Sequence, residues 1–208
     1  MPGTEGYKDV LDRFIETTEA VPFDVLHWAL LGVLRPPPAR VLDVGAGIGR
    51  DAAVLAERRY RVVAVEPLVA YRVARQQRYE GAGITWVDDA LRDLASFRAG
   101  PQFDLVLASG DWHHLNATEQ ATALKRVAML MHPGGVVMLS LRHGPAGAGR
   151  HVFPTSGARM LRVAQACCLT PNPEASLRLV LNFEAGFGCE RMQRGCPIRV
   201  TTCEGIHV

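Results

Sequence analysis

The chain alternates short runs rich in Val and Leu with longer stretches whose apolar residues recur every three or four positions. The short runs predict strands that are buried on both faces, and the longer stretches predict amphipathic helices. This alternation is typical of a parallel sheet covered by helices, so we expect a doubly wound α/β fold. The expected strands are Arg40–Val44, Arg61–Val65, Ile84–Val87, Phe103–Ala108 and Gly135–Leu141, and the expected helices between them are Arg50–Arg59, Leu68–Tyr79 and Thr118–His132.

The segments before and after this core have a different pattern. Three consecutive prolines close the leading segment, and a loop rich in Gly, Pro and Ala opens the last one. The expected elements are leading helices at Tyr7–Ala20 and Phe23–Leu34, then a helix at Gly157–Cys168 and strands at Leu177–Leu181 and Ile198–Thr202. We therefore expect one domain over residues 1–208, with an N-terminal helical cap (1–39), a core (40–142) and a C-terminal part that completes the sheet (143–208).

One helix start has a specific signal. Asn116 followed by Glu119 resembles a capping box, in which each residue satisfies a backbone N–H of the first helical turn. The helix that begins there should end before Pro133-Gly134-Gly135, because proline does not continue a helix.

Composition narrows the class of protein. With 208 residues, 48% hydrophobic and 21% charged, the chain fits one compact globular domain rather than a fibre or a disordered tail. Lys and Arg number 23 against 21 Asp and Glu, a net charge of +2, which is too balanced for a dedicated binder of nucleic acid or membrane surfaces. We therefore expect a small, soluble partner and no nucleic acid or membrane. The oligomeric state stays open.

Targeting signals and metal-ligand patterns narrow the expectation further. The N-terminus lacks the basic end and apolar stretch of a signal peptide, so a cytoplasmic location is expected. All five cysteines fall in the last quarter of the chain without paired C-x-x-C spacing, which favours reduced thiols over a zinc site. The histidines are scattered, and no metal is expected.

The strongest local signal runs from Val41 to Asp51, where an apolar strand leads into three alternating glycines and then a helix. Glycine takes positive φ angles and lets the backbone approach a ligand closely. The helix that begins after Gly49 would aim free N–H groups at an anionic group. The loop therefore predicts a site for a nucleotide-like ligand.

The loop alone does not identify that ligand. Gly47-x-Gly49-x-x-Ala52 also satisfies a dinucleotide fingerprint, and Glu66 ends the next strand where a ribose-binding acid belongs. Three other features distinguish the alternatives: Asp43 just before the glycines, the pair Asp88-Asp89 at the end of the third strand, and His132-Pro133-Gly134-Gly135 before the fifth.

Together these features resemble the class I S-adenosylmethionine-dependent methyltransferases, and in detail the small bacterial methyltransferase-domain proteins of unassigned substrate. The resemblance covers roughly Val41 to Leu141. It implies a Rossmann-like sheet of seven strands, parallel except for the last strand, which is inserted between the fifth and the sixth. It also implies S-adenosyl-L-methionine as cofactor and S-adenosyl-L-homocysteine as product.

The resemblance assigns roles to the residues that match its motifs. Main-chain atoms of Gly45, Ala46 and Gly47 would line the methionine and ribose part of the cofactor. Asp43 would anchor the loop toward the cofactor's ammonium. Arg50, in the first helical turn, would pair with the cofactor's carboxylate, because a guanidinium fork fits that anion.

The next two strand ends would hold the adenosine. Glu66, followed by Pro67, would accept hydrogen bonds from both ribose hydroxyls. Asp89 would receive the adenine amino group, while the Ala90 N–H would meet a ring nitrogen. Asp88 stands where many relatives have glycine, so one of the two acids is expected to be exposed.

The segment after the fourth strand, from Ser109 to Leu115, should lie at the mouth of the site, because ligands bind beyond the carboxyl ends of parallel strands. Ser109 would contact the cofactor. Methyl transfer from a sulfonium is an in-line displacement that needs the acceptor held near the methyl and, if it is protonated, a base. His113 and His114 are the candidate bases.

The leading helices supply possible covers for this site. Tyr7, His27 and Trp28 are candidates to close over it, with core packing as the alternative for Trp28.

The sequence therefore predicts a methyltransferase that moves a methyl group from S-adenosylmethionine to an unidentified small molecule. Two alternatives stay open. One is a member of the fold that binds the cofactor without methylating, and the other is an NAD(P)-dependent oxidoreductase.

Overall fold

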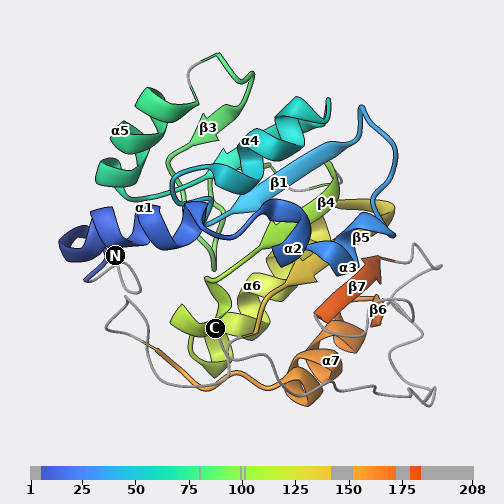
Figure 1. Ribbon diagram of the computed structural model, residues 1–208. Coiled ribbons are helices and arrows are strands. Elements are labelled where there is room, and N and C mark those ends of the chain that lie inside the picture. Colours follow the sequence, from blue (N-terminus) through green and yellow to red (C-terminus); the bar gives the residue numbers. More distant parts are fainter. Residues whose placement is uncertain are drawn as a thin grey trace.

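A computed structural model describes residues 6–79, 81–98, 100, 102–141, 152–171 and 179–183 (Figure 1). Its strands form one sheet in the order β3-β2-β1-β4-β5-β7-β6. The strands are β1 (Arg40–Val44), β2 (Arg61–Val65), β3 (Thr85–Val87), β4 (Phe103–Ala108), β5 (Met131–Leu139), β6 (Leu169–Pro171) and β7 (Leu179–Phe183). The predicted doubly wound α/β class is confirmed.

The direction in which the strand order runs changes at the centre of the sheet. Strands β3, β2, β1, β4 and β5 pair in parallel, and β7 pairs antiparallel with both β5 and β6. From β1 the chain first moves outward through β2 to β3, and then returns to the other side of β1 with β4. In open α/β sheets, such a switch point opens a crevice at the carboxyl ends of the strands, where ligands bind.

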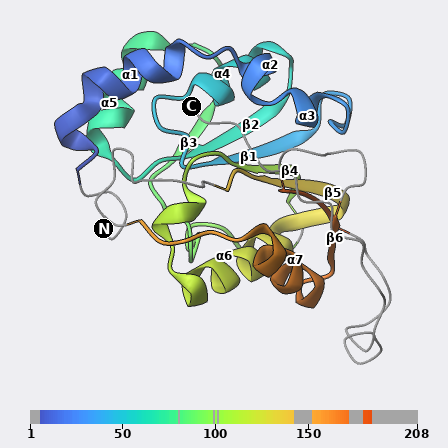
Figure 2. The same ribbon diagram turned by 60° about the horizontal axis from the view of Figure 1, so that its bottom comes forward.

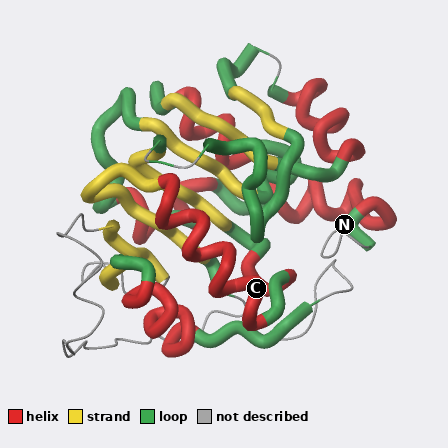
Figure 3. Tube along the Cα trace, turned by 180° about the vertical axis from the view of Figure 1, so that it is seen from behind, coloured by secondary structure: helices red, strands yellow, loops and turns green. Residues whose placement is uncertain are grey.

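Helices cover both faces of the sheet, as Figure 2 shows. One face carries α4 (Arg50–Glu57) and α5 (Val69–Arg78), together with the described part of the cap. The other face carries α6 (Ala117–Leu130) and α7 (Gly157–Ala166), and Figure 3 shows α6 lying across the strands from behind. The cap elements are the 3-10 helix η1 (Lys8–Val10) and the helices α1 (Leu11–Glu19), α2 (Phe23–Leu26) and α3 (Trp28–Leu31).

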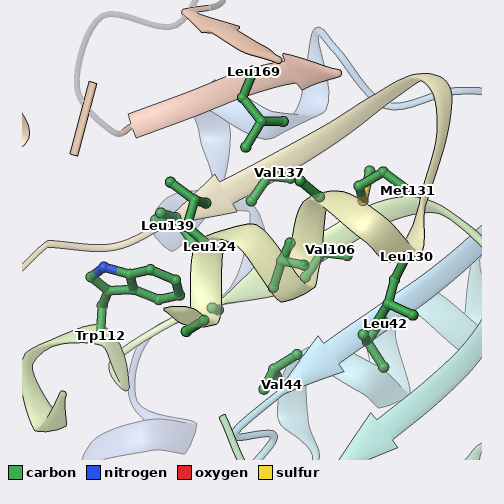
Figure 4. Close-up of a cluster of buried hydrophobic side chains, with 14 of the residues drawn as sticks. Leu42, Val44, Val106, Trp112, Leu124, Leu130, Met131, Val137, Leu139 and Leu169 are labelled. Carbon is green, nitrogen blue, oxygen red and sulfur yellow. The ribbon is translucent and has the colours of Figure 1, made fainter. Parts of the chain in front are cut away.

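Alternate residues of the central strands pack on opposite faces. In β1, Leu42 and Val44 belong to the cluster beneath α6 and α7, whereas Val41 belongs to the cluster beneath α4. Both clusters are fully buried here, which explains why the strand is an almost continuous apolar run. Figure 4 shows the first cluster, in which Trp112 lies toward the N-terminal end of α6. The exception to the apolar run is Asp43, which is only 2% exposed.

The predicted capping box is present at the start of α6. The Asn116 side chain accepts hydrogen bonds from the N–H groups of Thr118 and Glu119, at 2.9 and 3.0 Å. In return, the Glu119 carboxylate accepts one from the Asn116 N–H at 2.8 Å. The cap anchors a helix whose start positions the preceding loop.

The start of β5 differs from the prediction. The strand begins at Met131 rather than Gly135, because Met131 already pairs with Phe103. The register then shifts, and the next pair is Leu105 with Val136. His132 to Gly135 therefore form an irregular part of the strand rather than a loop before it. Proline and glycine are tolerated at such irregularities because few ladder hydrogen bonds are required there.

The two ends of the chain differ more from the expectation. The leading helix expected over Phe23–Leu34 is broken at His27 into α2 and α3. Strand β6 follows α7 after two residues and was not predicted, whereas β7 corresponds to the strand expected at Leu177–Leu181. The strand expected at Ile198–Thr202 lies outside the described residues. In the described part of the chain, no helix has the length and apolarity needed to cross a membrane.

Candidate functional site

The glycine loop joins β1 to α4 and is closed by its own hydrogen bonds. The Ala46 N–H donates to the Val65 carbonyl at 2.9 Å, and the Gly49 N–H donates to the Ala46 carbonyl at 2.8 Å. The Gly47 N–H donates to Oε2 of Glu66 at 2.9 Å. These three N–H groups of the loop are therefore engaged, and the expectation of free N–H groups in the first turn of the helix after Gly49 stays a prediction.

Close contacts explain why the loop needs glycine. A Cβ on Gly45, where φ is +66°, would lie 2.1 Å from Cγ of Asp111. A Cβ on Gly49, where φ is +86°, would lie 2.7 Å from the Trp86 ring. The carboxyl group of Asp111 thus rests directly against the loop, and any side chain at position 45 would displace it.

Glu66 follows β2 and is only 4% exposed. Its Oε1 accepts a hydrogen bond from the Leu68 N–H at 2.7 Å, and its Oε2 accepts the bond from Gly47. Each carboxylate oxygen can accept a further hydrogen bond. The structure therefore fixes Glu66, with Pro67 beside it, between the end of β2 and the glycine loop, and its binding of ribose stays a prediction.

Two further buried carboxyl groups lie beside the same loop. Asp43 accepts a hydrogen bond from the Ala52 backbone, but its Oδ2 is buried without a partner, as is Oδ2 of Asp111. Burial raises the pKa of Asp111 well above its usual range, and the charges of Glu66 and Asp43 raise it further. Burial likewise raises the pKa of Asp43, and the charges of Asp51 and Glu66 add to the rise while Arg50 opposes it. The carboxyl groups of Asp43, Glu66 and Asp111 thus lie beside the glycine loop. Among the described residues, no positively charged group is a cause of the pKa shift of Asp111.

Arg50 lies elsewhere than expected. Its guanidinium donates to Oδ1 of Asp51 at 2.7 Å and to the carbonyls of Thr18 and Val21 at 2.7 and 3.2 Å. These contacts tie the end of α1 to the start of α4. Pairing of Arg50 with a cofactor carboxylate is therefore a prediction that its observed contacts do not favour.

The other oxygen of Asp51 belongs to a buried pair. Its Oδ2 lies 2.7 Å from Nε2 of His27, which is fully buried. Burial alone would raise the pKa of Asp51, but the hydrogen bonds and charges of His27 and Arg50 outweigh it and lower the pKa. His27 therefore holds the cap to α4 rather than covering the site.

At the end of β3, the two acids differ as expected: Asp88 is exposed and Asp89 is half-buried. Asp89 Oδ1 accepts a hydrogen bond from the Ala90 N–H at 2.8 Å, and Oδ2 accepts one from the Ser96 N–H at 2.7 Å. Asp89 thus organises the turn, and the Ala90 N–H expected for an adenine nitrogen is bonded to it. Adenine binding here stays a prediction.

The two candidate bases lie in the 3-10 helix η2 (Trp112–His114) and are both buried. The Gln120 amide donates to the Leu115 carbonyl at 2.9 Å and the Phe153 N–H to the His113 carbonyl at 2.8 Å, which fixes this segment from two sides. The hydroxyl of Tyr7 lies 2.7 Å from Nε2 of His114. Ser109 is half-buried in the turn before η2.

Aromatic side chains cover the same end of the sheet. Phe14 and Tyr71 stack with their ring centroids 4.9 Å apart, and Tyr7 meets both rings edge-on. Burial raises the pKa of the Tyr71 hydroxyl, and Tyr7 and Glu66 add to the rise, so this phenol stays neutral. Of the expected covers, Tyr7 is in place. Trp28 is 44% exposed, so its expected packing in the core was wrong.

Sequence reasoning placed Asp111 at the mouth of the site but gave it no role, and it did not identify Phe14 or Tyr71 as parts of this site. Asp111 follows β4 directly, which was a usable signal. Phe14 and Tyr71 carry no motif, and only the packing of α1 against α5 brings them together. Among the residues that the structure describes, no group of three or more His, Cys, Asp and Glu side chains is arranged to hold a metal ion.

Known proteins are similar to this chain. Residues 41–135 match the family model of a methyltransferase domain. Over 166 residues the chain is 30% identical to glycine N-methyltransferase of Rattus norvegicus, covering 69% of this chain and 56% of that protein. Over 127 residues it is 36% identical to an uncharacterised methyltransferase of Mycobacterium bovis, covering 57% of this chain and 62% of the relative. The chain thus spans little more than half the length of these relatives.

A solved structure is similar over more of the chain. It is 1,6-didemethyltoxoflavin-N1-methyltransferase of Burkholderia thailandensis, with bound 1,6-didemethyltoxoflavin and S-adenosylhomocysteine. The two proteins are 25% identical with a TM-score of 0.62, covering 87% of this chain and 85% of that one. The motifs, the strand order and these matches together show that the chain belongs to the class I S-adenosylmethionine-dependent methyltransferases.

Proposed function

We propose that this protein is an enzyme that transfers a methyl group from S-adenosylmethionine to a small-molecule acceptor. The cofactor would lie across the carboxyl ends of β3, β2 and β1, with its ribose at Glu66 and its amino-acid end at the glycine loop. When bound, it would supply an electrophilic methyl group on a positively charged sulfur.

The observation that carries this proposal is the acidic character of the site. Asp43, Glu66 and Asp111 are carboxyl groups beside the loop, and two of them have a buried oxygen without a partner. S-adenosylmethionine carries a sulfonium and an ammonium against a single carboxylate. A ligand with net positive charge compensates buried acids, which are costly when left uncompensated.

The same observation argues against a dinucleotide. The N–H groups of Ala46, Gly47 and Gly49 are bonded within the protein, so these three donors of the glycine loop are not available to a pyrophosphate. Three nearby carboxyl groups would repel its negative charges. The structure therefore gives the alternative of an NAD(P)-dependent oxidoreductase less support than the sequence does.

Calorimetric titration of the purified protein with S-adenosylhomocysteine, and with NAD(H) in parallel, tests the proposal. We expect micromolar binding of the first ligand, with a matching rise in melting temperature, and no binding of NAD(H). The reverse pattern would establish the oxidoreductase, and binding of neither would refute both. Screening acceptors for release of S-adenosylhomocysteine then separates an enzyme from a member that binds without methylating.

His114 is the residue best placed to act on the acceptor. It lies beyond the end of β4, and the Tyr7 hydroxyl holds its Nε2 at 2.7 Å. An imidazole oriented in this way can accept a proton from an acceptor as the methyl group is transferred. His113 packs against it with the ring centroids 4.1 Å apart, so the two imidazoles support one another's position.

His114→Ala should lower turnover more than it lowers affinity for S-adenosylhomocysteine, by roughly 10²-fold or more if the residue is a general base. His132→Ala is the matched control, because His132 pairs with Asp104 between β4 and β5 rather than lying in η2. A loss confined to cofactor binding would remove His114 from the reaction.

We also keep the cytoplasm as the proposed location. Cys167 and Cys168 are free thiols, as is usual in a reducing compartment.

A further inference from the structure

The carboxyl group of Asp111 lies against the glycine loop and close to two other acids, Asp43 and Glu66. Its Oδ2 is buried without a hydrogen-bond partner, and its side chain rests against Gly45. Neither the motifs nor the matches to known proteins assign it a role. We propose that Asp111 binds the ammonium group of the cofactor's amino-acid end, an inference that rests on the proposed function.

The strand order gives the position of that group. Glu66 follows β2, Gly45 follows β1, and Asp111 follows β4, which is the next strand in the sheet. A ligand whose ribose lies at Glu66 and whose chain extends along the strand ends passes Gly45 next. Its far end then reaches the turn after β4. The amino-acid end of the cofactor, rather than its adenosine, therefore meets Asp111.

The charge of the surroundings decides which part of that amino-acid end faces Asp111. An α-amino acid presents both an ammonium and a carboxylate. Asp43 and Glu66 are both acids, and their ionised forms disfavour a negative charge at Asp111. A carboxylate would be repelled by this group, whereas an ammonium, with three N–H donors, can donate to the unpartnered oxygens of Asp43 and Asp111 together.

The close contact between Asp111 and Gly45 supports the same assignment. Asp111 sits so close that a Cβ at position 45 would overlap its Cγ at 2.1 Å. By contrast Gly110, which also has positive φ, has open space where a Cβ would stand. The contact with Gly45 leaves Asp111 little freedom to turn toward solvent. Its carboxyl group is thus preoriented for a ligand that lies on the loop.

Two ligands and one isosteric substitution test the proposal. S-adenosylhomocysteine carries the ammonium, whereas 5′-methylthioadenosine keeps the adenosine and the sulfur but has no amino-acid end. Asp111→Asn should weaken binding of S-adenosylhomocysteine roughly 10- to 100-fold, the usual loss for one hydrogen bond to a charged group. It should leave binding of 5′-methylthioadenosine within about twofold. Asp93→Asn, at an exposed aspartate, is the matched control and should alter neither affinity.

A second measurement follows proton release on ligand binding. Burial favours the neutral form of Asp111, which has Asp43 and Glu66 nearby and is followed by His113 and His114 in the same turn. An ammonium that binds beside Asp111 should therefore displace its proton. Calorimetry of S-adenosylhomocysteine binding in buffers of different ionisation enthalpy should show proton release by the wild type. The Asp111→Asn variant should release less.

The outcomes are distinct. Equal affinities of wild type and Asp111→Asn for S-adenosylhomocysteine would overturn the inference, and so would equal weakening of both ligands, which indicates a structural role. If the wild type binds neither ligand, the proposed function itself fails. Thermal unfolding of Asp111→Asn, in which asparagine keeps the size of the side chain, confirms that each titration reports on folded protein.

Discussion

Two aspartates with buried carboxyl oxygens lie near the glycine loop, Asp51 at the start of α4 and Asp111 after β4, and they differ in their partners. Asp51, at the start of α4, accepts bonds from His27 and Arg50, and its pKa is lowered. Asp111, against Gly45, has a buried oxygen without a partner, and its pKa is raised. The first arrangement stabilises the fold, because charge and partner are both supplied by the chain. The second costs stability until a ligand supplies the cation.

Removing Asp51, whose carboxylate is paired with His27 and Arg50, should have the largest effect on the free energy of unfolding. Asp51→Ala leaves His27 buried without its partner and frees Arg50 from one of its acceptors, so we expect a loss of about 3–5 kcal/mol in the free energy of unfolding. Urea unfolding measures it. Because the pKa of Asp51 is lowered on folding, the wild type should gain this stability above the carboxyl's ordinary value of 3.8 and lose it as the pH falls through the folded pKa.

Glu66 differs from both aspartates, because the backbone N–H groups of Gly47 and Leu68 hold its carboxylate beside the loop. Glu66→Ala should weaken binding of S-adenosylhomocysteine by roughly 1–3 kcal/mol, since it removes a charged acceptor. Isothermal titration measures this. Asp88→Ala removes an exposed acid at the end of the neighbouring strand β3 and serves as control. An unchanged affinity for Glu66→Ala would show that the ribose lies elsewhere.

At Asp111, which has an unpartnered carboxyl oxygen, a substitution should raise the free energy of unfolding instead of lowering it. Asp111→Asn should raise the free energy of unfolding of the ligand-free protein at neutral pH by about 1 kcal/mol, because it removes an unpartnered buried acid. The folded wild type holds a proton that the unfolded chain releases above 3.8, so its stability should fall as the pH rises from there to the folded pKa. This decline should be smaller in the variant. A destabilised Asp111→Asn protein would show that the residue has an unseen partner.

The smallest effect belongs to an exposed pair. Asp24→Ala breaks the contact of Asp24 with Arg58, where the oxygen and nitrogen lie 2.6 Å apart and the side chains are 54% and 37% exposed. We expect less than about 1 kcal/mol in the same urea experiment, since water compensates both charges. A loss as large as that of Asp51→Ala would mean that burial does not account for the difference between the acids.

The sequence was sufficient for the centre of the fold. β1, β2 and β4 have the predicted bounds, because strands buried on both faces are continuous apolar runs between clear turn residues. The capping box at Asn116 and Glu119 was equally legible, since it depends on side chains three positions apart. Such signals are local, and the sequence carries them directly.

The missed features depend on distant contacts. Three-residue β6 is too short to show a period, and the early start of β5 follows from the pairing of Met131 with Phe103. In the site, Glu66 and Asp43 were recognisable from their place in the motif, whereas Asp111 lay in a segment predicted at the mouth of the site and had no role until its carboxyl group was seen against Gly45. The expected role of Arg50 ignored the carbonyls of Thr18 and Val21, which lie at and just after the end of α1, 32 and 29 residues away in the sequence.

The space that Gly45 leaves for Asp111 also constrains how this protein can change over evolutionary time. A methyl group at position 45 and a carboxyl group at position 111 would occupy the same volume. The two positions, 66 residues apart in the chain, are therefore expected to covary: a larger residue at 45 should occur only where 111 has become small. A lineage that lost the acid at 111 would also lose the reason to keep this particular glycine, apart from its positive φ.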